Sequence, residues 1–162
     1  MLIDITSFTG GPRQIENAVA TQKTAAQVAV AERINAYIEF YQLRFLRRAL
    51  GGGLGALVDE YTKHEHNEPN EDYEKIVELL REPFADFVFF YMLRDMNVQP
   101  TITGLVQLKC ANAYVSTLEK GVETWNRMVD GMVLFVLSIS GVGVEDVVVD
   151  DDLLTSINNF NL

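Results

Sequence analysis

Residues 82–132, EPFADFVFFYMLRDMNVQPTITGLVQLKCANAYVSTLEKGVETWNRMVDGM, decide the fold of this chain. The first part of the stretch, from Pro83 to Val98, is rich in Phe and Tyr and is apolar around most of a helical circumference. A helix with that pattern is typical of a protein interior. Pro83 suits the first turn of a helix, and a helix must end before Pro100. The stretch therefore predicts a buried helix over residues 83–97.

The second part of the stretch predicts another helix. Ser116 and Glu119 have the spacing of a capping box, in which each side chain bonds the backbone N–H of the other residue. Apolar side chains then recur at helical spacing through Val122, Trp125 and Met132, and the pattern continues to Phe135. We expect a helix over residues 116–139 with Trp125 facing the core.

Outward from this centre, an apolar stripe through Ile34, Tyr41, Phe45 and Ala49 predicts a helix that ends at the glycines 51–53. The arginines in its last turns, Arg44, Arg47 and Arg48, complement the helix dipole or form a docking site for an acidic partner. The full set of expected helices is 14–50, 54–61, 72–81, 83–97 and 116–139, with minor extended segments at the N-terminus, around 102–110 and around 146–150. The predicted fold is mainly α: a single-domain helical bundle over 1–162, with an extended N-terminal arm (1–12) and an acidic C-terminal tail (142–162).

The charge of the chain is negative and unevenly distributed. The net charge is -10, and the acidic residues concentrate in residues 51–82 and in the tail. Nucleic-acid affinity comes largely from Lys and Arg that neutralise phosphates, so we expect no specific nucleic-acid binding. The apolar run 128–144 is too short and too interrupted to span a membrane. The lone Cys110 allows no internal disulfide, and without a leader-like opening the sequence favours an intracellular setting.

Residues that could carry chemistry are few. His64 and His66 flank one acid but are the only two histidines of the chain, and a zinc site needs three or four ligands. Cys110 has no His that its spacing would place nearby, so we expect a structural cysteine rather than a nucleophile. The aspartates 150–152 lack the ligand spacing of a calcium loop. We expect no metal, no cofactor and no enzymatic activity.

Several stretches together resemble a known family. They are the N-terminal Met1–Ile5 with Phe8; the helix end Phe45–Gly51 followed by Leu54 and Leu57; the aromatic helix Phe84–Arg94; the block Thr103–Val106, Asn112–Ala113, Val115–Ser116, Lys120 and Trp125–Val129; and the terminal Asn158–Leu162. In their order and spacing these resemble the small head-tail connector (adaptor or neck) proteins of tailed phages and prophages, in the version common in Bacteroidetes prophages. The glycine run 51–53 and the acidic loop 62–75 depart from that pattern.

The resemblance implies a mostly helical structural protein without catalysis. Such a subunit assembles as a ring, for which a dodecamer is expected, between the portal protein and a tail-side connector or tail-completion protein. It would form part of the DNA conduit and would be found in the virion, and in the host cytoplasm during assembly. An acidic conduit fits this role because it does not bind the DNA that passes through it. The alternative is a cytoplasmic helical protein-interaction or regulatory module without catalysis, which predicts a monomer or dimer.

Both ends of the chain are candidate interfaces. They are too apolar for solvated tails and too short to form cores, so we expect them to become ordered on a neighbouring subunit. The candidate interface residues are Leu2, Ile3, Ile5, Phe8, Ile157, Phe160 and Leu162.

Overall fold

The structure, a computed structural model, describes residues 1–16, 18–19, 24–64, 69–96, 98–101, 104–107, 117–139 and 147–158. Its helices are α1 (Ala25–Leu50), α2 (Gly52–Lys63), α3 (Glu71–Met96) and α4 (Thr117–Ile139). Strands β1 (Val98–Thr101) and β2 (Gly104–Gln107) form an antiparallel hairpin between α3 and α4, and Ile5–Phe8 (η1), Gly11–Arg13 (η2) and Asp151–Leu154 (η3) are short 3-10 helices. The predicted mainly α bundle is confirmed.

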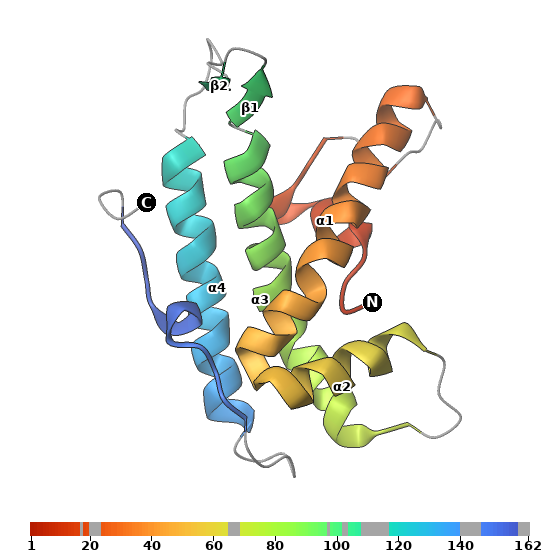
Figure 1. Cartoon of the computed structure of the whole chain (residues 1–162), viewed down its shortest axis with the longest axis vertical. Coiled ribbons are helices and arrows are strands. Elements are labelled where there is room, and N and C mark those ends of the chain that lie inside the picture. The colour runs from red at the N-terminus through yellow and green to blue at the C-terminus, as the bar shows by residue number, and fades with distance from the viewer. Residues whose placement is uncertain are drawn as a thin grey trace.

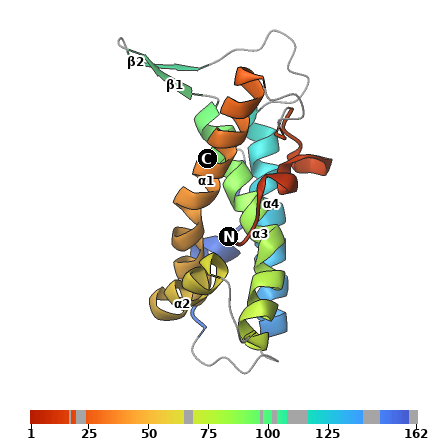
Figure 2. The ribbon, with the colours of Figure 1, turned by 90° about the vertical axis from the view of Figure 1, so that its right-hand side faces the viewer.

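The long helices lie side by side. Figures 1 and 2 show α4 along one side of α3 and α1 on the other, while α2 crosses at the end of α1. None of the described helices is long and apolar enough to cross a membrane.

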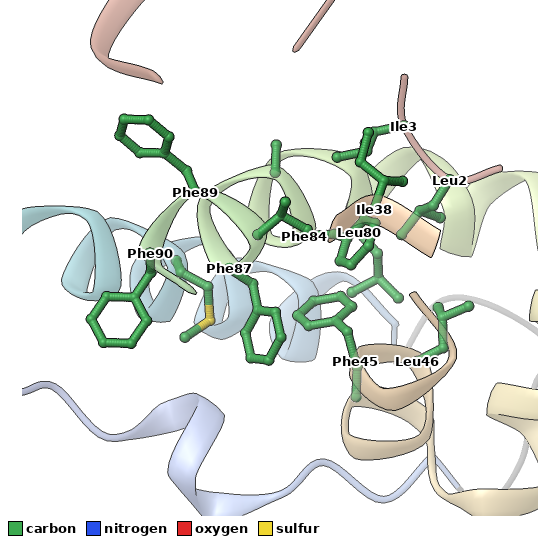
Figure 3. Packing of buried hydrophobic residues seen from close by; sticks show 14 of the residues in the cluster. Leu2, Ile3, Ile38, Phe45, Leu46, Leu80, Phe84, Phe87, Phe89 and Phe90 are labelled. Atoms are coloured by element: carbon green, nitrogen blue, oxygen red, sulfur yellow. The ribbon is translucent and has the colours of Figure 1, made fainter. Parts of the chain in front are cut away.

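The core follows the predicted stripes. Ile34, Phe45 and Ala49 of α1 are buried, and so are Phe87 of α3 and Trp125 of α4. Tyr91, which lies in the helix predicted to be buried, is half-buried and packs against this core. Figure 3 shows that side chains from α1, α3 and the N-terminal segment meet in one cluster.

The first correction concerns Pro83. We predicted separate helices over 72–81 and 83–97, but α3 runs unbroken with Pro83 inside it. Proline cannot donate the hydrogen bond to the carbonyl four residues earlier, which normally kinks or breaks a helix. Here the ring of Pro83 is buried against Gly131 of α4, so close that a Cβ on Gly131 would lie 2.8 Å from the Pro83 Cγ. Packing between α3 and α4 holds the helix together across the proline.

The second correction concerns the N-terminal region. Instead of an extended arm, residues 5–8 and 11–13 form 3-10 helices, and Leu2, Ile3 and Phe8 are buried in the core of their own chain. The expected helix over 14–50 begins only at Ala25, where the Thr24 hydroxyl accepts a hydrogen bond from the Gln27 N–H. The Ile15 N–H instead donates to the Phe8 carbonyl at 2.9 Å, which folds the segment back on η1.

The other boundaries lie close to the expected ones. α1 ends at Leu50 and is capped by Gly51, whose φ of 84° is a conformation that favours glycine. The extended segment expected around 102–110 is confirmed over β2, and residues 147–150 are not helical. The proposed Ser116 cap and Cys110 lie outside the described residues.

Candidate interaction surfaces

A buried ionic cluster joins η2, α3 and α4. The carboxylate of Asp86, whose side chain is 3% exposed, accepts hydrogen bonds from the Arg127 Nε at 3.0 Å and 2.9 Å and from the Arg127 Nη2. Arg13 places its Nη1 3.1 Å from the same carboxylate and donates from Nη2 to Glu82 at 2.6 Å. Buried charges are stable only when they are paired. Two guanidinium groups therefore neutralise Asp86 inside the bundle.

Within this cluster, the pKa of Arg13 is perturbed by its surroundings. Burial acts to lower the pKa of Arg13, but the carboxylates of Glu82 and Asp86 outweigh burial and the pKa is raised. The Arg13 Nε is buried and has no hydrogen-bond partner among the described residues. Beside the cluster an open pocket of about 790 Å³ is lined by Gly11, Pro12, Gln14, Glu16, Lys120, Glu123, Thr124 and Arg127. The lining of this pocket carries both signs of charge, and its Arg127 is already bound to Asp86. We therefore assign the ionic cluster a structural role, which is to join η2, α3 and α4.

An aromatic cluster covers the junction of α1 and α3. Tyr41 stacks on Tyr91 with ring centroids 4.6 Å apart, and its ring meets Phe40 edge-on at 4.9 Å. The guanidinium carbon of Arg44 lies 3.9 Å from the centroid of the Phe40 ring, and that of Arg94 lies 5.4 Å from the centroid of Tyr91. Phe40 is 54% exposed. Aromatic rings held against arginines are typical of the centres of protein–protein interfaces.

The surroundings of the same cluster raise the pKa values of two tyrosines, Tyr37 and Tyr41. Burial, together with the hydrogen bond that the Tyr37 hydroxyl donates to Asp95 at 2.9 Å, raises the pKa of Tyr37 to about 12. Burial also raises the pKa of Tyr41, and nearby Asp95 adds to that effect. Both phenols are neutral at physiological pH: Tyr37 acts as a hydrogen-bond donor to Asp95, and Tyr41 acts as a packing surface.

The C-terminal half of α4 is apolar on both of its faces. Met132 and Phe135 are buried against α3, whereas Val133 is 43% exposed, Leu134 63% and Val136 38%. A helix at the surface of a protein ordinarily carries polar side chains on its outer face. This outer face is an exposed apolar surface, which we call the α4 apolar face (Val133, Leu134 and Val136).

The segment 147–158 lies beside α4 (Figure 1). Side chains of α1 and α4 hold it there. Arg48 donates to Asp150 at 2.7 Å and to Asp152 at 3.1 Å, and the Asp150 N–H donates to the Arg48 carbonyl. Trp125 Nε1 donates to the Thr155 carbonyl at 2.9 Å. The hydrogen bond from Arg48 lowers the pKa of Asp150. The segment is thus bound to its own chain by polar contacts.

The structure places most of the predicted interface residues inside the subunit. Leu2, Ile3 and Phe8 are buried in its own core, and Ile5 and Ile157 are half-buried against that core. Both backbone groups of Ile157 bond the Asn126 side chain, at 2.9 Å and 3.0 Å. The expectation that these ends become ordered only on a neighbour is corrected for these five residues, because the chain's own helices bind them. Phe160 and Leu162 lie outside the described residues.

The candidate ligands that the structure describes are not brought together. His64 Nε2 lies 3.1 Å from Glu60 Oε1, and His66 is outside the described ranges. Within those ranges, no group of three or more His, Cys, Asp or Glu is placed to hold a metal ion. Asp150 caps η3 and pairs with Arg48, a contact that its position in an acidic run did not suggest.

The buried charge of Asp86 was not identified from the sequence as part of an ion pair. Asp86 is an acid in the middle of the aromatic stretch FADFVFF, and a charge in a helix that is apolar all round needs a buried partner. That signal predicts an ion pair but not its partner, because Arg13 and Arg127 come from distant parts of the chain.

Comparison of the chain with models of known protein families, with curated protein sequences and with solved structures found no significant match.

Proposed function

We propose that the chain is a non-catalytic structural subunit of a phage virion, a head-tail connector that assembles as a ring between the portal and the tail. The observation that carries this proposal is the α4 apolar face. Its exposed Val133 and Leu134 lie on a helix that is already buried on its other side. Exposed apolar surfaces of this kind mark places where another molecule binds. In a ring, a neighbouring subunit or the portal covers this face.

Two further observations support the proposal. The resemblance to connector proteins runs in order from the N-terminal residues to the terminal Asn158–Leu162. The net charge of -10 suits a conduit, because a wall that repels phosphates lets DNA pass without binding it. The ring is expected to contain twelve subunits by that resemblance, and to contact the portal on one side and a tail-side connector on the other.

Substitution of the α4 apolar face tests the proposal. In the double variant Val133→Ser with Leu134→Ser, both side chains are exposed, so thermal unfolding is expected to stay close to wild type. Assembly with the portal protein of the same phage genome, followed by electron microscopy, is expected to lose ring-bearing particles. Leu118→Ser is the matched control, since Leu118 is an exposed apolar residue at the other end of the same helix. Its assembly is expected to be normal.

Two results would contradict the proposal. If the double variant is incorporated normally into particles, the α4 apolar face is not an assembly surface. A wild-type chain that stays monomeric or dimeric and outside particles, encoded among genes unrelated to capsids and tails, would favour the regulatory-module alternative. A coding sequence between capsid and tail genes is the expected arrangement.

A further inference from the structure

A stripe of arginines and aromatic side chains runs along the outer face of α1. Arg33, Tyr37, Phe40, Arg44 and Arg47 follow one another at intervals of four, three, four and three residues, which places them on one side of the helix. The arginines and Phe40 are exposed, and Tyr37 is half-buried. We call these five residues the basic stripe. It is a local concentration of positive charge on a chain whose net charge is -10.

Contacts within the subunit hold part of the basic stripe in place. Arg44 lies over the Phe40 ring, and the Tyr37 hydroxyl is bonded to Asp95 of α3. The acids of the same helix, Glu32 and Glu39, lie roughly 80–100° around the axis from Phe40, at about 100° per residue, and so outside the stripe. Side chains that are held before binding lose less entropy at an interface. The stripe therefore has the features of a binding surface for an acidic partner.

A complementary acidic surface lies on the first half of α3. Glu71, Glu74 and Glu78 are exposed and lie on one side of the helix, opposite the buried Ile76 and Leu80. We call the three glutamates the acidic stripe. Glu74 also accepts a hydrogen bond from the Tyr61 hydroxyl at 3.2 Å, which orients its carboxylate. Residues 51–82 hold three basic and nine acidic side chains, so the acidic stripe lies in the most acidic helical region of the chain.

We propose that the basic stripe of one copy of this chain docks on the acidic stripe of a second copy, which rests on the assembly proposed above and names its subunit contact. The spacing fits: Arg44 and Arg47 are one turn apart, as are Glu74 and Glu78, and side chains at such positions lie about 5–6 Å from each other. Two copies of an acidic chain repel each other at long range, so a specific contact between them needs local complementarity of this kind. Phe40, at the middle of the basic stripe, supplies an apolar centre.

The proposed contact uses different surfaces on its two partners. A heterologous contact leaves one basic and one acidic stripe open after each addition, so it continues to a ring or to a filament. A two-fold dimer with both contacts made reciprocally is the other geometry that the same pairing allows. The number of subunits in the assembly separates the two geometries.

Two neutralising double variants test the contact. Arg44→Gln with Arg47→Gln removes charge from the basic stripe, and Glu74→Gln with Glu78→Gln removes it from the acidic stripe. Each variant alone is expected to self-associate at least about tenfold more weakly than wild type in sedimentation at low ionic strength. Wild-type association is expected to weaken as salt is added. The controls Glu39→Gln and Asp130→Asn change exposed charges outside the stripes and are expected to associate as wild type does.

Mixing the two variants is the decisive measurement. Each variant keeps one intact stripe, so a heterologous contact yields a one-to-one pair that grows no further, whereas either variant alone does not pair. Failure of the mixture to pair, an equal effect of the control variants, or no association of the wild type would overturn the proposal. The proposal would also be overturned if the basic-stripe variant lost association while the acidic-stripe variant associated as wild type does. That result would indicate that the basic stripe binds a different acidic surface.

The outcomes also separate this contact from the proposed function. If both double variants still form rings with the portal, the contact is wrong and the ring stands. If the wild type associates through the stripes but stops at a dimer, the contact stands and the ring is wrong.

Discussion

The carboxylate of Asp86 is buried, and two arginines from distant parts of the chain bind it. Such a pair adds little net stability compared with an apolar pair of the same size, but removal of one member leaves a buried charge unpaired. The pair therefore matters chiefly for specificity: η2 and α4 have to approach α3 in the one arrangement that brings Arg13 and Arg127 to the same carboxylate.

The first prediction concerns this pair. Asp86→Asn removes the charge and keeps the size of the side chain. It is expected to lower the free energy of unfolding by about 3 kcal/mol, because Arg13 and Arg127 both lose their buried anionic partner and Arg13 keeps only the exposed Glu82. Urea denaturation measures the change. Asp130→Asn, at an exposed position of α4, serves as the control and is expected to change stability by less than about 0.5 kcal/mol. A loss below about 1 kcal/mol for Asp86→Asn would mean that water reaches the cluster.

The second prediction follows from Tyr37, whose pKa is raised to about 12 by burial and by the neighbouring Asp95. The unfolded chain releases the phenol proton near pH 10. A group whose pKa is raised in the folded state stabilises the fold fully below the unfolded pKa and loses this contribution as the pH rises through the folded pKa. Stability is therefore expected to fall between about pH 10 and 12, and less steeply in Tyr37→Phe. Denaturation at a series of pH values tests this, and parallel curves for the two proteins would contradict it.

At the scale of elements, the contact between α3 and α4 keeps α3 continuous at Pro83. By itself, the proline would favour a helix boundary at this position. Gly131 of α4 faces the ring of Pro83, and its lack of a side chain allows the two helices to approach. Gly121, earlier in the same helix, faces Phe90, and a Cβ added there would lie at an ordinary contact distance of 3.8 Å from that ring. The two glycines of one helix therefore differ in what a methyl group would meet.

The third prediction compares these glycines. Ala is ordinarily better than Gly inside a helix by about 1 kcal/mol. Gly121→Ala is expected to be neutral or stabilising, because its Cβ would be in normal contact. Gly131→Ala is expected to destabilise the protein by about 1–3 kcal/mol, since the Pro83 ring is rigid and the helices must move apart. Thermal or urea unfolding of both variants gives the comparison, and stabilisation by Gly131→Ala would show that α3 and α4 separate at no cost.

At the scale of the whole molecule, the two ends of the described chain close the bundle from different sides. Leu2 and Phe8 complete the core beside α1 and α3, and the segment 147–158 follows α4 and the end of α1. The amide of Asn126 bonds both the N–H and the carbonyl of Ile157, as a neighbouring strand would. The free subunit therefore carries residues 147–158 already bound, and the candidate interaction surfaces described above lie on α1, α3 and α4.

The fourth prediction concerns that segment. Asn126→Ala removes both bonds to Ile157 and is expected to cost about 1–2 kcal/mol. Hydrogen exchange at the Ile157 amide is expected to accelerate strongly, while amides in the middle of α3 keep their protection. Ser138→Ala, at an exposed position of α4, is the control and leaves the exchange of Ile157 unchanged. Unchanged exchange in Asn126→Ala would mean that Trp125 and Arg48 alone hold the segment.

The sequence by itself determined the helical class of this protein, the stripes of α1 and α4, the buried aromatic part of α3 and the helix end at Gly51. These follow from periodicity and from local backbone chemistry, which act over a few residues and are readable in one chain. The tertiary structure decided what depends on distant partners: the unbroken α3 across Pro83, the pairing of β1 with β2, the burial of Leu2 and Phe8, and the partners of Asp86. Burial against another helix changes the free energy of a local conformation by more than its intrinsic preference, so an N-terminal segment that reads as a free arm becomes part of the core.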